Sequence, residues 1–121
     1  MSELKKNKIK LSIIVAIYNL EKYLPRCLDA LVNQTLQDIE ILCVDDGSTD
    51  SAPQIIEEYA KKYPEKIKVF HKENGGEFTT RNYGLERATG ECVTFVDTDD
   101  WVEPTWAEKL YNAAKEYDAD I

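Results

Sequence analysis

The chain has 121 residues, 43% of them hydrophobic, and a formal net charge of −8. This length suits one domain with a packed core, and the negative charge argues against a nucleic-acid partner, which would require a basic surface. The apolar run Leu11–Ile17 is too short for a signal sequence or a membrane span, and three cysteines without CxxC spacing favour a reducing, cytoplasmic compartment.

Strand-like and helix-like segments alternate along the chain after a polar N-terminal extension over residues 1–10. Short apolar, β-branched runs predict strands, and apolar residues at helical spacing predict helices. In chain order we expect a strand at 11–17, a helix at 21–34, a strand at 39–44, a helix at 53–63, a strand at 67–71, a helix at 77–88, a strand at 91–96 and a helix at 104–117. Strands separated by helices indicate an α/β fold with an open, mostly parallel sheet and helices on both faces.

Local signals mark where these elements begin and end. Asp50 or Ser51 is expected to cap the second helix, and Gly90 is expected to end the third. Pro104 is expected at the first position of the last helix, where no intrahelical bond needs its missing N–H. Residues 118–121 have the pattern of a further strand, so we expect the domain to continue in a longer protein.

Two of the predicted strands run directly into carboxylates. Asp97, Asp99 and Asp100 follow the fourth strand, and Asp45 and Asp46 follow the second. Such groups repel one another unless a cation lies between them, and Mg²⁺ and Mn²⁺ take oxygen ligands. Because ligands of open α/β sheets bind outside the carboxyl ends of the strands, the clusters predict a metal–diphosphate site. The alternative is an ordinary turn, since Asp is a common turn and helix-capping residue.

Two other positions fit either a functional or a structural role. Gly75 and Gly76 can present backbone N–H groups to a phosphate near a helix start, or they can form only a turn. His71, the one histidine of the chain, fits either a general base or an ordinary surface residue. The residues alone leave both questions open.

The motifs taken together resemble those of the bacterial family 2 glycosyltransferases. The matching stretches are 12–19 (SIIVAIYN), 33–35 (NQT), 44–50 (VDDGSTD), 74–76 (NGG), 81–85 (RNYGL) and 90–91 (GE), leading to 95–100 (FVDTDD). They occur in the family's order and cover almost all of residues 11–104. The resemblance implies a GT-A fold. Residues 11–121 would form its Rossmann-like, nucleotide-sugar-binding part, with the acceptor-binding half and its catalytic base beyond Ile121.

The resemblance also implies roles for residues around the nucleotide. Tyr18 is expected to stack on the base, with the backbone near Ala16 in contact with it. One of Asp45 and Asp46, preferably Asp46, is expected to accept a hydrogen bond from the uracil ring N–H. Arg81 is expected to lie near the nucleotide and to offset acidic charge. From the residues alone, Tyr18 also fits a core or rim position, and Arg81 also fits a weak surface salt bridge.

The stretch Asp97-Thr98-Asp99 resembles the family's DxD element. One carboxylate is expected to bind Mn²⁺ or Mg²⁺ and the other to bind the ribose or an ordered water, with Thr98 beside the nucleotide. Asp100 is an alternative metal ligand. The chain departs from the family pattern at Glu77, where a small residue is usual. A glutamate there is unfavourable near a diphosphate unless it points away or helps to hold the metal.

The resemblance implies inverting transfer of a sugar from a nucleotide-diphospho-sugar, first of all a UDP-sugar, to an acceptor hydroxyl in cell-surface polysaccharide or glycoconjugate synthesis. We expect a saccharide or lipid-linked acceptor, and a full-length protein in the cytoplasm at the inner face of the membrane. This fragment alone should be inactive, and its open sheet edge should favour a homodimer. The alternatives are a non-catalytic nucleotide-binding module and, with less support, a nucleotidyltransferase or a phosphoacceptor receiver domain. A nucleotidyltransferase would have a Gly-rich, basic loop directly after the first strand, and a receiver domain would have acidic residues there; this chain has Tyr18-Asn19.

Overall fold

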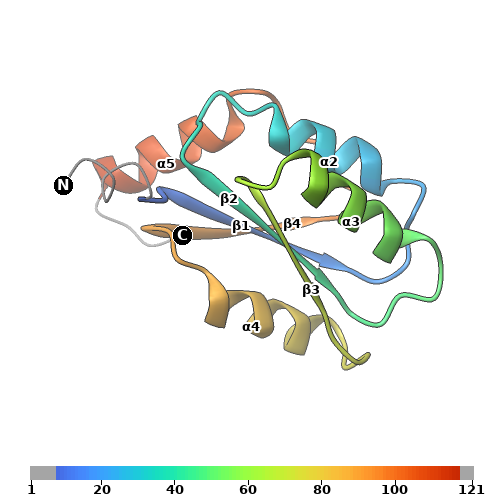
Figure 1. Cartoon of the computed structure of the whole chain (residues 1–121). Coiled ribbons are helices and arrows are strands. Elements are labelled where there is room, and N and C mark those ends of the chain that lie inside the picture. The colour runs from blue at the N-terminus through green and yellow to red at the C-terminus, as the bar shows by residue number, and fades with distance from the viewer. Residues whose placement is uncertain (1–7, 118–121) are drawn as a thin grey trace.

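The computed structural model describes residues 8–117, which form four strands and four helices in alternation (Figure 1). In chain order the elements are β1 (Leu11–Ile17), α2 (Leu24–Val32), β2 (Ile39–Asp45), α3 (Ala52–Lys62), β3 (Ile67–His71), α4 (Glu77–Arg87), β4 (Cys92–Asp97) and α5 (Trp106–Glu116). The predicted alternation is confirmed, with every element end within about three residues of the prediction. The further strand expected at 118–121 lies outside the described residues.

The four strands form one parallel sheet in the order β3-β2-β1-β4. β1 pairs with both β2 and β4, so Ile13 lies opposite Ile41 on one side and Thr94 on the other. Because all pairings are parallel, the carboxyl ends of the strands meet at one edge of the sheet. Helices α2, α3 and α5 cover one face and α4 covers the other (Figure 1). The open α/β sheet with helices on both faces is therefore confirmed.

The core has one layer on each face of the sheet. Alternate residues of β1, such as Ile13 and Val15, point into the larger layer with the residues of α2, α3 and α5. Ile14 points the other way, into the smaller layer beside α4. Gly84 allows α4 to approach this closely, because a Cβ at that position would lie 2.7 Å from Ile14 Cγ2. Each fully buried aliphatic side chain stabilises the fold by roughly 2 kcal/mol relative to exposure.

Two residues predicted to mark helix ends, Pro104 and Gly90, do not do so. Helix α5 begins at Trp106, so Pro104 precedes the helix, and its carbonyl accepts the Thr35 N–H at 2.9 Å. Helix α4 ends before it reaches Gly90, which therefore does not end it. Gly90 instead packs against β1, where a Cβ would lie 2.7 Å from Ser12 Oγ. In both cases a tertiary contact, rather than the local helix signal, fixes the residue.

The start of α3 uses one of its two predicted caps. Ser51 occupies the N-cap position without a side-chain hydrogen bond, whereas Asp50 Oδ1 accepts the Ala52 N–H at 2.9 Å. The same carboxylate accepts the Glu21 N–H through Oδ2 at 3.0 Å. Asp50 therefore joins the start of α3 to the segment that follows β1.

The structure also shows where the cysteines lie and whether a helix could span a membrane. All three cysteines are buried. Over residues 8–117, no helix is both long enough and apolar enough to cross a membrane. Most of the polar extension predicted at residues 1–10 lies outside the described part of the chain.

Candidate functional site

A cleft of about 460 Å³ opens at the carboxyl ends of β1, β2 and β4. Its walls come from the end of β1 and the turn after it, the turn after β2, the segment leading into α4, and the turn after β4. Of the residues predicted to form the site, those that line the cleft are Ala16, Tyr18, Asp46, Asp97, Thr98 and Asp99. Asp45, Arg81 and Asp100 lie outside its lining. The two acidic strand ends thus face one cleft, because β1 lies between β2 and β4.

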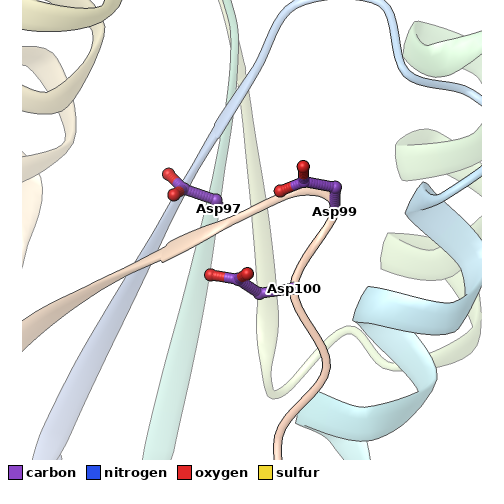
Figure 2. A group of neighbouring side chains, drawn as sticks. All are labelled: Asp97, Asp99 and Asp100. Atoms are coloured by element: carbon purple, nitrogen blue, oxygen red, sulfur yellow. The ribbon is translucent and has the colours of Figure 1, made fainter.

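An acidic trio, Asp97, Asp99 and Asp100, stands at the end of β4. Figure 2 shows the three carboxylates gathered at the strand end and in the loop that follows. One carboxylate oxygen from each lies within 4.8 Å of the others, and all three residues are exposed. The Asp100 N–H donates to the Asp97 carbonyl at 3.0 Å, which closes the turn. Hard oxygen donors this close together repel one another, and they suit a divalent cation such as Mg²⁺ or Mn²⁺.

Arg81, on α4, is paired with one member of the acidic trio. Its Nη2 lies 3.2 Å from Asp97 Oδ1 and 2.7 Å from Glu77 Oε1, and its guanidinium lies over the Phe95 ring. Glu77 lines the cleft, so this departure from the family pattern is accommodated by an ion pair. Both ion pairs are solvent-exposed and individually weak. Arg81 therefore offsets part of the trio's charge without neutralising it.

Tyr18 follows the last residue of β1 and presents a half-exposed ring along the cleft. The backbone after it is left-handed, with φ of 60° at Asn19 and 64° at Leu20. The turn after β2 holds this shape, because Asn19 N–H donates to Ser48 Oγ at 2.9 Å and Asn19 Oδ1 accepts the Thr49 N–H at 2.8 Å. Such backbone costs of order 1–3 kcal/mol per residue and persists only where neighbours enforce it. Asn19 was not recognised from the sequence as a supporting residue, although it ends the first family-like motif.

Thr98 joins the ends of β1 and β4. Its Oγ1 donates to the Ala16 carbonyl at 2.9 Å, and the residue is buried. Cys27, on α2, lies next to this junction, with its Sγ 3.8 Å from the Asp97 carbonyl. Burial, together with the negative charge of the acidic trio, raises the pKa of the Cys27 thiol to about 12. This thiol stays protonated at neutral pH and cannot serve as a nucleophile there.

Asp45 is turned away from the cleft, toward β3 and α3. Its Oδ1 accepts the Ser48 N–H at 2.9 Å, and its Oδ2 lies 2.9 Å from His71 Nδ1. His71 Nε2 lies 2.6 Å from Glu57 Oε2, so the imidazole bridges two carboxylates. The hydrogen bonds to Asp45 and then to Glu57 raise the pKa of His71 above its ordinary value. His71 thus ties three elements together outside the cleft, which favours the structural role over a general base.

Asp46 faces the cleft and is almost completely enclosed by the segment 72–76. Lys72 Nζ lies 2.7 Å from Oδ1, and the N–H groups of Gly75 and Gly76 donate to Oδ1 and Oδ2 at 2.9 and 3.0 Å. Burial opposes the negative charge, but these hydrogen bonds outweigh it and lower the pKa of Asp46. The glycine N–H groups expected to meet a phosphate are therefore engaged by Asp46. Lys72 was not recognised from the sequence as part of the site. The available signal was its position: it follows β3 directly, and β3 pairs with β2, the strand that ends in Asp45 and Asp46.

Known proteins share both the sequence pattern and the fold. The family Glycosyl transferase family 2 matches residues 12–121. The putative glycosyltransferase EpsH of Bacillus subtilis (strain 168) is 48% identical over 103 residues, which are 85% of this chain and 30% of that protein. The chain spans about a third or less of the length of the first curated relatives that it matches.

Two solved structures extend the comparison to the fold. S. aureus TarS in complex with UDP-GlcNAc matches with a TM-score of 0.81 and 36% identity, over 91% of this chain and 32% of that one. The mannosyltransferase PcManGT from Pyrobaculum calidifontis, in complex with GDP-Man and Mn²⁺, matches with a TM-score of 0.76 and 28% identity, over 89% of this chain and 32% of that one. The chain therefore belongs to glycosyl transferase family 2, as its motifs predicted.

Proposed function

We propose that this chain is the nucleotide-sugar-binding part of a glycosyltransferase that takes a UDP-sugar together with a divalent cation. The observation that carries the proposal is one cleft lined by Tyr18 and Asp46 and also by Asp97 and Asp99. The first pair suits a nucleobase, and the second pair suits a metal-bound diphosphate. A volume of about 460 Å³ lies within the range of small-molecule sites.

At the base end, the half-exposed ring of Tyr18 stacks on the nucleobase. Stacking of this kind contributes about 1–3 kcal/mol and tolerates any base, so it provides affinity rather than discrimination. Discrimination comes from Asp46, which carries no proton at neutral pH and accepts a hydrogen bond from a ring N–H such as uracil N3–H. Asp45 does not contact the base in this proposal; it holds the turn after β2 in place through its bonds to Ser48 and His71.

At the diphosphate end, the acidic trio fits a divalent cation because its oxygens gather within 4.8 Å of one another. Asp97 and Asp99 hold the cation in this proposal, with Asp100 as the alternative ligand. When bound, the cation supplies positive charge that stabilises the diphosphate as it leaves the sugar. Arg81, which reaches Asp97 at 3.2 Å, adds a second positive charge beside the phosphates.

In the proposed reaction, the hydroxyl of a saccharide or lipid-linked acceptor attacks the anomeric carbon on the side opposite the diphosphate. The configuration at that carbon is inverted, and the proton of the acceptor hydroxyl passes to a general base. We assign that base to the acceptor-binding part of a longer protein. The chain of 121 residues then binds the donor but does not transfer the sugar by itself.

The ligands of the structural relatives support the choice of donor and metal. TarS was solved with UDP-GlcNAc, and PcManGT was solved with GDP-Man and Mn²⁺. The test is a calorimetric titration of this chain with UDP, GDP and ADP, in Mn²⁺ and again in EDTA. UDP should bind most tightly, and EDTA should abolish its binding. Equal affinity for the three nucleotides, no binding of any of them, or binding that EDTA leaves unchanged would contradict the proposal.

A further inference from the structure

Lys72 is the charged partner of the most enclosed carboxylate in the cleft. Its Nζ lies 2.7 Å from Asp46 Oδ1, and the exposed fractions of the two side chains are 15% and 6%. The same ammonium donates to the Glu73 carbonyl at 2.8 Å and to Thr79 Oγ1 at 3.4 Å. An ammonium has three donors, so all of them are used and the side chain is fixed. Within residues 8–117, no other lysine or arginine forms an ion pair with Asp46.

Three of the four bonds to the Asp46 carboxylate are short, and the fourth is long. A carboxylate offers about four positions at which it can accept a hydrogen bond. Oδ1 accepts from Lys72 at 2.7 Å and from Gly75 at 2.9 Å, which fills both of its positions. Oδ2 accepts from Gly76 at 3.0 Å and, at 3.4 Å, from Asn74 Nδ2, which is the longest and weakest of the four bonds. Asp46 lines the cleft, and a ligand N–H can replace the long Asn74 bond to Oδ2, because Asn74 Nδ2 also donates to the Asp46 carbonyl at 3.0 Å.

We propose that Lys72 is a positioning residue for the nucleobase: by holding Asp46 Oδ1, it keeps the carboxylate charged and turned so that Oδ2 accepts the ring N–H of the base. This role rests on the proposed function, because it describes how the base end of the same site is built. Lys72 itself lies outside the lining of the cleft. It therefore acts through Asp46 and not by direct contact with the nucleotide.

The surroundings of Asp46 make this one cation decisive for its charge. Besides Lys72, the ionisable groups near Asp46 are mostly acids: Asp45, Glu73, Glu77, Asp97, Asp99 and Asp100, with Tyr18 on the cleft wall. The nearby cations Arg81 and His71 are paired with other carboxylates, Arg81 with Glu77 and Asp97 and His71 with Asp45 and Glu57, so the surrounding acids favour the protonated form of Asp46, as burial does. Without Lys72, we expect Asp46 to take up a proton at a higher pH. A protonated Asp46 would present a donor where the base requires an acceptor.

The first test measures UDP affinity in Mn²⁺ against pH for the whole chain and for Lys72→Met. The variant should bind at least about tenfold more weakly at pH 7, and affinity should fall by up to about tenfold for each pH unit below the raised pKa. Lys72→Gln keeps a donor for Oδ1 without the charge, so its affinity should lie between the two. The control is Lys61→Met, at an exposed lysine on α3, which should follow the parent. A loss in Lys72→Met that is the same at every pH would indicate a merely structural role and would overturn the inference.

The second test asks whether Lys72 acts through Asp46. In an Asp46→Asn background, Lys72→Met should change UDP affinity by less than about twofold, because two residues of one network do not have additive effects. Equal losses in both backgrounds would mean that Lys72 contacts the nucleotide directly, and the inference would fail.

A third measurement does not depend on nucleotide binding. Carbon-13 NMR of the Asp46 carboxyl should show that it titrates at a higher pH in Lys72→Met, or in Lys72→Gln if the first variant does not fold. An unchanged titration would overturn the role of Lys72. If the parent chain binds no UDP in Mn²⁺ while Asp46 titrates as expected, the proposed function is what fails.

Discussion

The cleft has two acidic regions, and they are built in opposite ways. Asp46, after β2, is 4% exposed and is held by Lys72 and two backbone N–H groups. The acidic trio, after β4, is exposed, and among the described residues Arg81 is the cation that pairs with it. The protein thus completes the electrostatics of the first region itself. It leaves the second with an excess of negative charge, which a divalent cation would offset in the proposed function.

This contrast gives the two regions opposite responses to the loss of a carboxylate. Removing the enclosed carboxylate leaves a largely enclosed ammonium and two backbone N–H groups without their acceptor, so it should damage the fold. Removing one of the exposed carboxylates relieves repulsion, so it should damage ligand binding and leave the fold intact. The predictions below begin with the largest expected effect.

The largest effect is expected from Asp46→Ala. The substitution leaves Lys72 and the N–H groups of Gly75 and Gly76 without their acceptor. Breaking a buried ion pair by removing one partner costs 3–5 kcal/mol, and we expect about 3 kcal/mol because Lys72 retains some access to water. Urea unfolding followed by circular dichroism measures the loss. Asp38→Ala, at an exposed carboxylate, is the matched control and should cost less than about 1 kcal/mol. Equal losses would show that the bonds around Asp46 do not stabilise the fold.

The second largest effect is expected from Asp99→Asn, which should weaken UDP binding and leave the fold intact. Asp99→Asn removes one charge from the acidic trio, so Mn²⁺-dependent UDP affinity should fall by at least about 100-fold. The melting temperature should be unchanged or higher, because like charges repel less in the variant. Calorimetry and thermal melts measure the two quantities, with Glu116→Gln as a control at an exposed acid on α5. A variant that binds Mn²⁺ and UDP like the parent would show that the metal is held elsewhere.

A smaller effect is expected from His71, on the pH dependence of the free energy of unfolding. Hydrogen bonds to Asp45 and then to Glu57 raise the pKa of His71 above its ordinary value. Stabilisation from the protonated imidazole is complete below the unfolded-state pKa and disappears as the pH rises through the raised folded-state pKa. The difference in unfolding free energy between the parent and His71→Gln should therefore be larger at about pH 6 than at about pH 9. It should not exceed about 1 kcal/mol, since the His71 side chain is 44% exposed. A difference that grows with pH would mean that His71 is neutral in the folded chain.

The two acidic strand ends also show how far the sequence can predict this site. Apolar runs that end in carboxylates were enough to predict that two strand ends meet at one cleft, because a parallel sheet brings its carboxyl ends together. They were not enough to choose between Asp45 and Asp46. Successive residues at a strand end point to opposite sides, so the choice depends on where the strand ends. The predicted strand ended at Val44, whereas β2 ends at Asp45 and Asp46 faces the cleft.

Lys72 and the two glycines could not be assigned for a related reason. Lys72 lies 26 residues from Asp46 in sequence, and they meet because β2 and β3 pair with Asp45 opposite His71. The glycine motif predicted N–H groups near a helix start, and α4 does begin directly after Gly76. Which acceptor these groups find depends on the position of Asp46, which no local pattern encodes. Long-range pairing, rather than local propensity, fixes this half of the site.

The smallest effect concerns β4, the strand that carries the acidic trio. It lies at one end of the sheet order, so its outer edge has no strand partner within residues 8–117. Phe95, on this strand, is 38% exposed. An open strand edge beside an exposed apolar side chain favours association. We therefore expect weak dimerisation at high concentration, which light scattering across a dilution series measures.

Two variants connect this association to the edge rather than to apolar surface in general. Phe95→Lys places a charge on the edge strand and should weaken the dimer, because charged side chains are a common protection against edge pairing. Phe78→Lys, at an exposed phenylalanine on α4, should leave the dimer unchanged. Equal weakening by both variants would assign the association to apolar surface. A strict monomer at every concentration would mean that the edge is not available for pairing. Because the trio stands at the end of the same strand, its repulsion opposes the approach of a second copy, so Mn²⁺ should strengthen the dimer and EDTA should weaken it.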